Sequence, residues 1–503
     1  MDFTSFLQES ETYKTIPIIN RFIADTLTPI QIFQNLKEEA SFILESKDAS
    51  SPWSRYSFIG LQPFLYITNR KDKFVVQNDK RHTVTSQPSL QAAYTYVQEM
   101  IKLKQLDEDI PFYGGAVGFI SYDAVNSLDK VPVHKVNDLG LPLYHFLFCE
   151  TLIVFDHHSR ELSIIHLIRL TGNEDEACKV AMYEHGIAKI NMYVKQLAQH
   201  KDVTRKLLPA TYNKEVDFTG VASNYTKNQF VADVEKVKEY IRAGDVFQTV
   251  LSQRFEIPLK VSGFDLYRVL RSVNPSPYLF YIRFDDVEAV GSSPERLIQI
   301  HNKHLEIHPI AGTRRRGRTS DEDDALANDL LNDEKEKAEH YMLVDLARND
   351  IGMVAEYGTV SVPTLMELGR FSHVMHLISK VTGRLRHDVH PIDALLKAFP
   401  AGTVSGAPKV RAMQIIQELE PCARNMYAGT VAYIGFDGNI DSCITIRTII
   451  VKDHVAYVQA GAGIVADSVP ELEYKETKNK ASALIRTIQI AHELFGQEEK
   501  LHV

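Results

Sequence analysis

The sequence predicts an α+β fold with a large, mostly antiparallel sheet. Strand-like segments come in runs along the chain, helical segments lie irregularly between them, and no repeat of short period is present. A parallel sheet would need strict alternation of strands and helices, so these runs favour antiparallel pairing. With 503 residues the chain is long enough to bury a large core and to hold more than one domain.

The N-terminal part combines strand-like and helical segments. Strands are expected at 63–70 (PFLYITNR) and 151–158 (TLIVFDHH), and an amphipathic helix at 92–103. A polar, aperiodic stretch at 199–224 is typical of a linker or a surface loop. The chain therefore divides into three predicted parts: an N-terminal region at 1–205, a linker at 206–225 and a C-terminal region at 226–495.

The patterning is sharper beyond the linker. Apolar residues spaced three and four apart from Phe230 to Ile241 predict a helix, and Gly244 is its expected C-cap. Further strands are expected at YLFYIRFD (278–285), HLEIHPI (304–310), GTVAYIGF (429–436), SCITIRTIIV (442–451) and HVAYVQA (454–460). Further helices are expected at 321–349, 392–399, 408–420 and 470–494.

Composition argues against several classes of protein. The hydrophobic content of 44% and charged content of 24% are those of an ordinary globular protein. The net charge of −9 argues against a nucleic-acid-binding surface, which needs a basic excess. The sequence contains no run of 18 apolar residues, so no membrane span is predicted, and the N-terminus lacks the pattern of a signal peptide. The four cysteines have no zinc or disulfide spacing, so a cytoplasmic location is expected.

Two acidic pairs carry the clearest chemical signal. Glu336 and Glu339 form one pair, Glu473 and Glu476 the other, and a spacing of three places each pair on one helix face. Carboxylates so close repel each other, and a cation or exposure to solvent relieves the repulsion. Oxygen ligands without nearby Cys or His suit a hard ion such as Mg²⁺. The alternative is two solvated acidic helix faces.

Two glycine-containing motifs remain open to more than one interpretation. GAGIVA (461–466) matches the spacing of a dinucleotide fingerprint but lacks the βαβ context. Its backbone amides could bind an anion beside the helix of the second acidic pair, or it could be a tight turn between a strand and a helix. AGTVSGAPKVRAM (401–413) lacks the ending of a P-loop and could be only a helix cap, with Pro408 at the first helical position.

Single residues are weaker signals. His376 lies in an apolar segment and is either a packed core residue or a proton shuttle. Glu295 follows a strand and a turn, where partial shielding could raise its pKa for use as a general acid. The basic run from Arg314 to Arg318 is either a solvated loop or a small anion-binding patch. No serine or cysteine nucleophile motif is present, so the protein is expected to position reactants and not to form a covalent intermediate.

Taken together, the segments resemble the chorismate-utilising enzymes, and among them most closely the anthranilate synthase large subunits. The matching segments are LESKDASSPWSRYSFIG (44–60), GDVFQTVLSQRF (244–255), NPSPYLFYIRFDDVEAVGSSPERL (274–297), HPIAGTRRRG (308–317), EKAEHYMLVDLARNDIG (336–352), FSHVMHL (371–377), FPAGTVSGAPKVRAMQII (399–416), YAGTVAYIGFDGNIDSCITIRT (427–448) and QAGAGIVADSVPELEYKETKNKA (459–481). The resemblance is dense from about 225 to 490 and looser before it. It implies a two-subdomain sandwich flanked by helices.

The resemblance also implies a reaction, in which chorismate and ammonia give anthranilate and pyruvate at the first committed step of tryptophan biosynthesis. Glu295 would be the general acid on the leaving hydroxyl, and His376 would serve the aromatising step. Magnesium would be held by Glu339 and Glu476, with Glu336 and Glu473 acting through water. The implied substrate contacts are Tyr427 and Arg447 for the enolpyruvyl carboxylate, the backbone of Gly312, Thr313, Gly461, Ala462 and Gly463 for the ring carboxylate, and Lys480 near the carboxylates.

Two positions distinguish members of the family. Aminodeoxychorismate synthases typically carry a nucleophilic lysine where this chain has Ala311. Isochorismate and salicylate synthases carry a water-activating lysine where this chain has Gln248. Both residues therefore favour attack by ammonia and the formation of anthranilate. Aminodeoxychorismate synthase is the alternative activity, and the alternatives from other classes are a non-catalytic tryptophan sensor and a magnesium-binding scaffold.

The resemblance finally implies regulation and a partner. Glu45, Ser46, Pro277, Tyr278 and Leu279 match the contacts of the family's site for feedback inhibition by L-tryptophan. The segment 50–54 departs from the usual family pattern before RYSF, where glycine is common. The sequence has no candidate cysteine nucleophile of an amidotransferase module, so ammonia from glutamine would come from a separate glutamine amidotransferase subunit. The implied assembly is a heterodimer or a dimer of heterodimers.

Overall fold

Two long strands, β3 (Tyr56–Arg70) and β7 (Tyr144–Asp156), bend and take part in two antiparallel sheets. The structure is a computed structural model that describes residues 2–47, 52–106, 110–199, 215–370 and 374–496. The register between β3 and β7 shifts between Pro63 and Leu65. In β3 the residues before this irregularity belong to the first sheet and those after it to the second, whereas in the antiparallel β7 the order is reversed. Both sheets therefore meet at the same pair of strands.

All pairs between the strands of these sheets are antiparallel. The first sheet runs in the order β1 (Thr15–Ile23), β8 (Glu161–Arg169), β7, β3, β2 (Ala40–Glu45), β11 (Tyr278–Phe284), β12 (Val287–Ser293), β21 (Thr448–Lys452), β22 (Val455–Ile464) and β10 (Gln248–Pro258), with the short β9 (Ala222–Ser223) and β18 (Gly406–Ala407) on the outer edge of β10. The second runs in the order β5 (Thr83–Gln87), β4 (Lys73–Asn78), β3, β7, β6 (Gly115–Ile120), β19 (Thr430–Gly435), β20 (Ile440–Ile444), β13 (Arg296–His301), β14 (His304–Ile307), β17 (Val374–Arg384) and β16 (Ser361–Arg370), with β15 (Ile310–Arg315) beside β14 on the same edge of β17.

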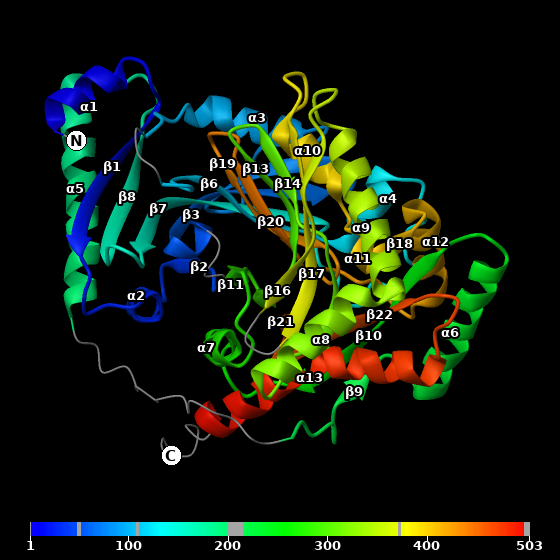
Figure 1. The fold of residues 1–503 in the computed structure, drawn as a ribbon. Helices are drawn as coiled ribbons and strands as arrows, with labels where there is room; N and C mark the ends of the chain where they lie inside the picture. Colours follow the sequence, from blue (N-terminus) through cyan, green and yellow to red (C-terminus); the bar gives the residue numbers. More distant parts are fainter. Residues whose placement is uncertain (1, 48–51, 107–109, 200–214, 371–373, 497–503) are drawn as a thin grey trace.

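The two sheets pack face to face around a central core. In β11, Phe280 and Ile282 point into this core, whereas Leu279 and Tyr281 belong to the core on the outer face. Such alternation with a period of two is expected when both faces of a strand are buried. The protein therefore has a sandwich of two sheets with a helical layer on each outer face (Figure 1).

Helices cover the outer faces through apolar stripes. The outer face of the first sheet is covered by α1 (Phe3–Ser10), α2 (Pro29–Asn35), α5 (Glu176–Ala198), α7 (Gly263–Val273) and α13 (Pro470–Phe495). The outer face of the second is covered by α3 (Leu90–Ile101), α9 (Glu334–Gly352), α10 (Pro391–Ala398) and part of α12 (Lys409–Leu419). Smaller clusters seat α6 (Lys227–Arg242) on β10 and β22, and α8 (Ser320–Asn332) on β17. The remaining short helices are η1 (Pro52–Arg55), η2 (Tyr122–Ala124), α4 (Val125–Leu128) and α11 (Gly402–Ser405).

The predicted α+β class with antiparallel sheets is confirmed, and five local predictions need correction. The predicted helix 321–349 is two helices, because Asp333 accepts hydrogen bonds from the amides of Lys335 and Glu336 and starts α9 as its N-cap. The predicted strand 442–451 is two strands, β20 and β21. Glycines 461 and 463 lie inside β22 and not in a turn. The C-cap of α6 is Ala243, one residue before Gly244, and Pro408 is the N-cap of α12 and not its first residue.

Several further sequence predictions can be placed. All four cysteines are free thiols, as their spacing predicts. Among the described residues, the structure contains no helix long and apolar enough to cross a membrane. The predicted linker lies partly outside the described residues, at 206–214, and the divergent segment 50–54 lies partly outside them, at 50–51. The division into two regions stays a prediction, although β2 from the first region pairs with β11 from the second.

Candidate active site

A cavity of about 790 Å³ is lined by residues from both sheets. Its size is within the range of small-ligand sites. It is lined by Glu295, His376, Thr313, Ala311, Tyr427, Arg447, Gly461, Gly463 and Lys480, and equally by Glu45, Ser46, Pro277, Tyr278 and Leu279. The residues predicted for substrate and those predicted for tryptophan thus line one continuous space.

Glu295 lies between β12 and β13, where the strand leaves the first sheet and enters the second. Its backbone carbonyl accepts a hydrogen bond from the amide of Ile444 at 3.0 Å, which fixes the turn. The residue is half-buried because it lines the cavity, and loss of water around its carboxyl raises its pKa to about 7. The Thr403 hydroxyl and the Lys480 ammonium oppose this rise. A carboxyl group with this pKa is able to donate a proton at neutral pH.

His376 is half-buried on β17 and faces the cavity, so it is not a packed core residue. The strand register places it opposite Thr313 on β15. Its Nδ1 lies 2.9 Å from the carbonyl oxygen of Gly312 and 3.1 Å from the hydroxyl of Thr313. Gly312 has a φ of +67°, a conformation that favours glycine, and it turns its carbonyl toward the histidine. These contacts orient the imidazole ring.

A cationic end of the cavity is formed by Arg447, Lys480 and the backbone of β22. The Arg447 guanidinium donates to the carbonyl of Lys480 at 2.9 Å, and the Lys480 ammonium donates to the carbonyl of Gly461 at 3.0 Å. Burial lowers the pKa of Arg447. Arg447 has a φ of +51°, which is uncommon outside glycine and is typical of functional positions.

Tyr427 completes this end of the cavity. Burial raises the pKa of its phenol to about 12, so the hydroxyl keeps its proton and is available as a donor. A Cβ atom added to Gly461 would lie 2.8 Å from the Tyr427 hydroxyl. Glycine at 461 is therefore required for the close approach of the tyrosine to the β22 backbone.

The four acidic residues gather beside the cavity without lining it. Glu336 and Glu339 lie on α9, and Glu473 and Glu476 lie on α13. Burial and the charges of Glu336 and Glu476 raise the pKa of Glu339, while burial and the charge of Glu476 raise the pKa of Glu473. All four are half-buried.

The acidic cluster is partly neutralised by protein cations. Lys480 forms an ion pair of 2.7 Å with Glu476, and Arg314 lies 3.4 Å from Glu336. The basic run 314–318 is therefore no anion-binding patch: Arg314, Arg315 and Arg316 pair with carboxylates of α8 and the start of α9. In the described part of the chain, no group of three His, Cys, Asp or Glu side chains is arranged to hold a metal ion by itself.

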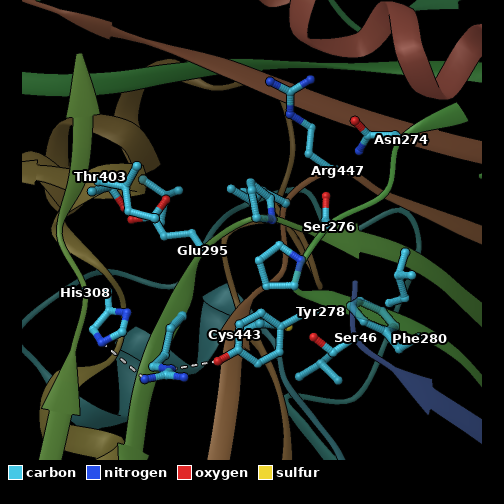
Figure 2. Close-up of a pocket in the computed structure, with 18 of the residues that line it drawn as sticks. Ser46, Asn274, Ser276, Tyr278, Phe280, Glu295, His308, Thr403, Cys443 and Arg447 are labelled. Atoms are coloured by element: carbon cyan, nitrogen blue, oxygen red, sulfur yellow. Dashed lines mark hydrogen bonds between the residues drawn. The ribbon is translucent and has the colours of Figure 1, made fainter. Parts of the chain in front are cut away.

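The half of the cavity predicted for tryptophan is built by the pairing of β2 with β11, in which Leu279 lies opposite Glu45. Glu45 is buried, and its carboxylate accepts hydrogen bonds from Arg271 at 2.9 Å and from Tyr267 at 2.6 Å. A ligand ammonium at this place would share the carboxylate with Arg271. Leu279 lines the cavity and also belongs to the outer core, and its neighbour Phe280 lines the cavity beside it (Figure 2).

Three of the predicted site residues do not line the cavity but lie next to residues that do. Gln248 is buried, and a Cβ added to Gly463 would lie 2.5 Å from its Nε2, so its amide packs directly behind the β22 backbone. Ala462 turns its side chain into a separate apolar cluster, as alternation along the strand requires. Gly312 lies behind Thr313 and close to Glu336.

Sequence reasoning missed several residues that line the cavity. Thr403 lies beside the Glu295 carboxyl (Figure 2), and the signal that could have found it is the glycine-flanked motif 401–408. Its hydroxyl makes no hydrogen bond of good geometry to any described residue, yet it lies close enough to lower the pKa of Glu295. Arg296, His308 and Asp441 also line the cavity, and no pattern in the sequence connects them.

The profile of the protein family described as chorismate binding enzyme matches residues 39–486. This chain belongs to that family. Anthranilate synthase component 1 of Geobacillus stearothermophilus is 57% identical over 500 residues, which cover 99% of this chain and 98% of the relative. The family resemblance inferred from the motifs is thereby confirmed.

Solved structures agree with this assignment. The crystal structure of anthranilate synthase component I from Streptococcus pneumoniae TIGR4 has a TM-score of 0.75 and 36% identity, and covers 93% of this chain and 99% of its own. The menaquinone-specific isochorismate synthase of Escherichia coli has a TM-score of 0.69 at 19% identity, covering 97% of this chain and 98% of its own, and shows the common fold alone. The two-sheet sandwich is thus the chorismate-binding fold.

Proposed function

We propose that this chain is the aminase subunit of an anthranilate synthase, converting chorismate and ammonia into anthranilate, pyruvate and water. The observation that carries the proposal is the placement of an acid with a pKa near 7, a half-buried imidazole and a buried guanidinium around one cavity. The 57% identity to an anthranilate synthase component 1 along almost the whole chain favours this activity over others in the family.

The substrate carries two carboxylates, and the cavity offers two places for them. Arg447 and the Tyr427 hydroxyl would bind the enolpyruvyl carboxylate, since a guanidinium matches a carboxylate in a planar, two-donor geometry. The β22 backbone at 461–463 and the Gly312–Thr313 segment would hold the ring carboxylate. Binding of the two carboxylates at these two separate places would fix the orientation of the ring.

The chemistry then follows from the proton donors beside the ring. Ammonia adds to the ring carbon next to the ring carboxylate, and the hydroxyl para to that carboxylate leaves as water with the proton of Glu295. In the next step the ring proton at the site of addition is removed and the enolpyruvyl group leaves as pyruvate. His376 would assist this aromatising step, with its ring held by Gly312 and Thr313.

The acidic cluster fits a magnesium ion. Burial and neighbouring carboxylates raise the pKa of Glu339 and of Glu473, a divalent cation would offset this repulsion, and the cluster offers only oxygen ligands. Glu339 and Glu476 would hold the ion directly, and Glu336 and Glu473 through water, with the remaining ligands from water and the ring carboxylate. When bound, magnesium supplies charge neutralisation and Lewis-acid polarisation of that carboxylate. Lys480 would have to release Glu476 as the ion binds.

The choice of nucleophile and product rests on two residues. Ala311 lines the cavity on the strand next to His376, and its methyl group has no nucleophile to offer. The Gln248 amide behind Gly463 cannot act as a base for water. Neither a covalent route nor attack by water is therefore supported by these positions, and ammonia is left as the attacking group.

The proposal includes regulation and a partner. L-tryptophan would bind at Glu45, Ser46, Pro277, Tyr278 and Leu279, with Phe280 beside them, and would inhibit turnover. Inhibition requires that bound tryptophan favours a state with a poorer active site. A component 1 pairs with another component, and we propose a glutamine amidotransferase subunit that supplies ammonia.

The test is an assay of the purified protein with chorismate, Mg²⁺ and an ammonium salt at mildly alkaline pH, followed by anthranilate fluorescence. We expect anthranilate formation that stops when the metal is chelated and returns when Mg²⁺ is added, and that falls when tryptophan is present. Chromatography of the products separates the alternatives. Aminodeoxychorismate or isochorismate as the only product would contradict the roles of Ala311 and Gln248, and tryptophan binding without turnover would identify a sensor.

A further inference from the structure

A network of polar and charged side chains lines the cavity and reaches both of its halves. Its centre is Arg296, which directly follows Glu295 in the sequence and is 10% exposed at its side chain. The guanidinium donates to the Tyr278 hydroxyl at 2.7 Å and to the Glu306 carboxylate at 2.6 Å. The Tyr278 hydroxyl in turn donates to Asp441 at 3.0 Å. One arginine thus binds a residue of the tryptophan half and lies beside the proposed general acid.

The network continues into the substrate half. Glu306 on β14 also lies 2.7 Å from the His308 imidazole and forms an ion pair with Lys380 on β17. His308 stands two residues before Ile310, where β15 begins, and β15 and β17 carry Thr313 and His376. The Arg296 guanidinium contacts the Tyr278 hydroxyl through Nε and lies 3.5 Å from the His308 ring through an Nη atom. Arg296 is therefore the shared partner of Tyr278 and of the strand segment that leads to the histidine.

The geometry of these bonds makes them sensitive to small displacements. A guanidinium donates its hydrogen bonds in a fixed plane. If a ligand rotated Tyr278, Arg296 would follow it only by changing its bond to Glu306 or by shifting the backbone at 295–296. Bonds between charged groups at low exposure are also costly to break, because an unpaired charge would remain buried. Motion in one half of the cavity is therefore transmitted to the other.

We propose that Arg296 is the positioning residue through which occupancy of the tryptophan half alters the substrate half, with the Tyr278 hydroxyl as its contact to the effector. This inference rests on the proposed feedback inhibition and adds the route by which it acts. Tyr278 would have two separate roles: its ring faces the effector, and its hydroxyl carries the coupling. The two roles predict that removal of the hydroxyl alone leaves effector binding in place but weakens inhibition.

The experiment compares Tyr278→Phe with Tyr281→Phe in the full chain. Tyr281 lies on the same strand and its hydroxyl donates to Glu288 at 2.7 Å, but it packs in the outer core away from the cavity, so it matches the loss of one tyrosine-to-carboxylate bond. Tryptophan affinity is measured by calorimetry, and coupling as the ratio of chorismate KM with and without saturating tryptophan. Each variant is normalised to its own uninhibited reaction.

For wild type and Tyr281→Phe we expect the same coupling ratio, in the range of about 5-fold to 150-fold that is usual between two sites. For Tyr278→Phe we expect a ratio near 1, with tryptophan still bound. Arg296→Lys keeps the charge but loses the planar fork, and we expect the same loss of coupling from it. Thermal unfolding of each variant identifies any that fails to fold, and the other variant then decides.

Three results would overturn the inference. If Tyr278→Phe binds tryptophan and is inhibited as strongly as wild type, the hydroxyl carries no coupling, while the feedback site itself stands. If Tyr278→Phe no longer binds tryptophan, the hydroxyl is a ligand contact and not a coupling element. If the wild-type protein gives no calorimetric signal with tryptophan, the feedback part of the proposed function fails and the coupling route fails with it.

Discussion

At the scale of single residues, the proposed general acid Glu295 shows how the fold raises the pKa of a carboxyl group. The turn between two strands holds the carboxyl against the protein, where burial raises its pKa from 4.5 to about 7. Thr403 and Lys480 limit this rise by stabilising the anion. A general acid works best when its pKa lies near the pH of the reaction, so the environment places this carboxyl in a useful range.

The first prediction concerns the pH dependence of turnover. At a constant concentration of unprotonated ammonia, kcat/KM for chorismate is expected to fall as pH rises through about 7, because the free enzyme loses the Glu295 proton there. Glu295→Gln should lower kcat by about 10²-fold to 10⁴-fold, the usual worth of general acid catalysis. Stopped assays over pH 5.5 to 9 measure both. A variant with undiminished kcat would remove Glu295 from the reaction.

The second prediction concerns stability at the same residue. A carboxyl whose pKa is raised by folding stabilises the native state only while it is protonated, so this contribution is lost as pH rises from 4.5 through about 7. At pH 8 the free energy of unfolding of Glu295→Gln, measured with denaturant, should therefore exceed that of wild type by up to about 3 kcal/mol. At pH 4 the two proteins should be equally stable. Glu334→Gln, at an exposed glutamate of α9, is the matched control and should show no such difference between the two pH values.

The third prediction concerns the acidic cluster. Glu339→Gln removes one charge from the proposed magnesium site and should raise the Mg²⁺ concentration for half-maximal activity by about 10-fold to 100-fold or more. Glu334→Gln again serves as the control, since it removes a glutamate of the same helix that pairs with Lys337 in solvent. Magnesium titrations of anthranilate formation measure the change. Identical titration curves for Glu339→Gln and wild type would place the metal elsewhere.

The residues of the site differ in how far the sequence could predict them. Glu295, His376, Arg447 and Tyr427 stand in long motifs, and their gathering around one cavity agrees with the family pattern. Their roles stay predictions. Arg296 and Asp441 could not be assigned, because Asp441 lies 163 residues beyond its partner Tyr278 and is brought to it by the pairing of β13 with β20. Charge or polarity alone does not specify such partners.

At the scale of secondary structure, the strand and helix periods predicted most elements, and errors occurred at their ends. The break between α8 and α9 was missed because helix-forming residues continue on both sides of it. A signal was available, since Asp333 followed by Glu336 is the spacing of an N-terminal cap. The extension of β22 through Gly461 and Gly463 was missed because isolated glycines usually mark turns, whereas here they admit Tyr427 and Gln248 to the backbone.

The fourth prediction tests this close approach in β22. A Cβ at position 461 would lie 2.8 Å from the Tyr427 hydroxyl and 3.0 Å from the Leu251 carbonyl oxygen. Gly461→Ala is therefore expected to displace Tyr427, to raise the KM for chorismate about 10-fold, and to cost about 1–3 kcal/mol of stability. Gly352→Ala is the control, because no atom lies within 4 Å of its added Cβ and helix propensity favours alanine. Equal kinetics for the two variants would contradict the argument.

At the scale of the whole molecule, the sheets join segments that are far apart in the sequence. The N-terminal β2 pairs with β11, and β6 pairs with β19, so both sheets contain strands from each predicted region. The central core likewise combines Phe42 and Phe119 with Phe280 and Tyr433. Local patterns predicted an antiparallel α+β protein but could not predict these partners, because strand periodicity does not specify which strand lies next to which.

The fifth prediction follows from this shared core. Fragments 1–205 and 215–503, expressed together, should associate into one active complex, since all the strand pairs between them can still form. Fragment 226–495 expressed alone should be insoluble or unfolded, because it lacks β2 and β6, which pair with one edge of β11 and of β19. Copurification and circular dichroism test both. A cooperative unfolding transition of 226–495 alone would show that the regions are independent domains.

The continuity of the 790 Å³ cavity has a consequence for inhibitor design. A single molecule with an aromatic amino acid at one end and a benzoate at the other would occupy both halves at once. Tethering makes the second contact intramolecular, so the affinity of such a molecule can exceed that of either fragment by about 10²-fold to 10⁴-fold without any new contact. A substitution that protects the enzyme from one fragment would leave the other as an anchor, so resistance would require changes in both halves.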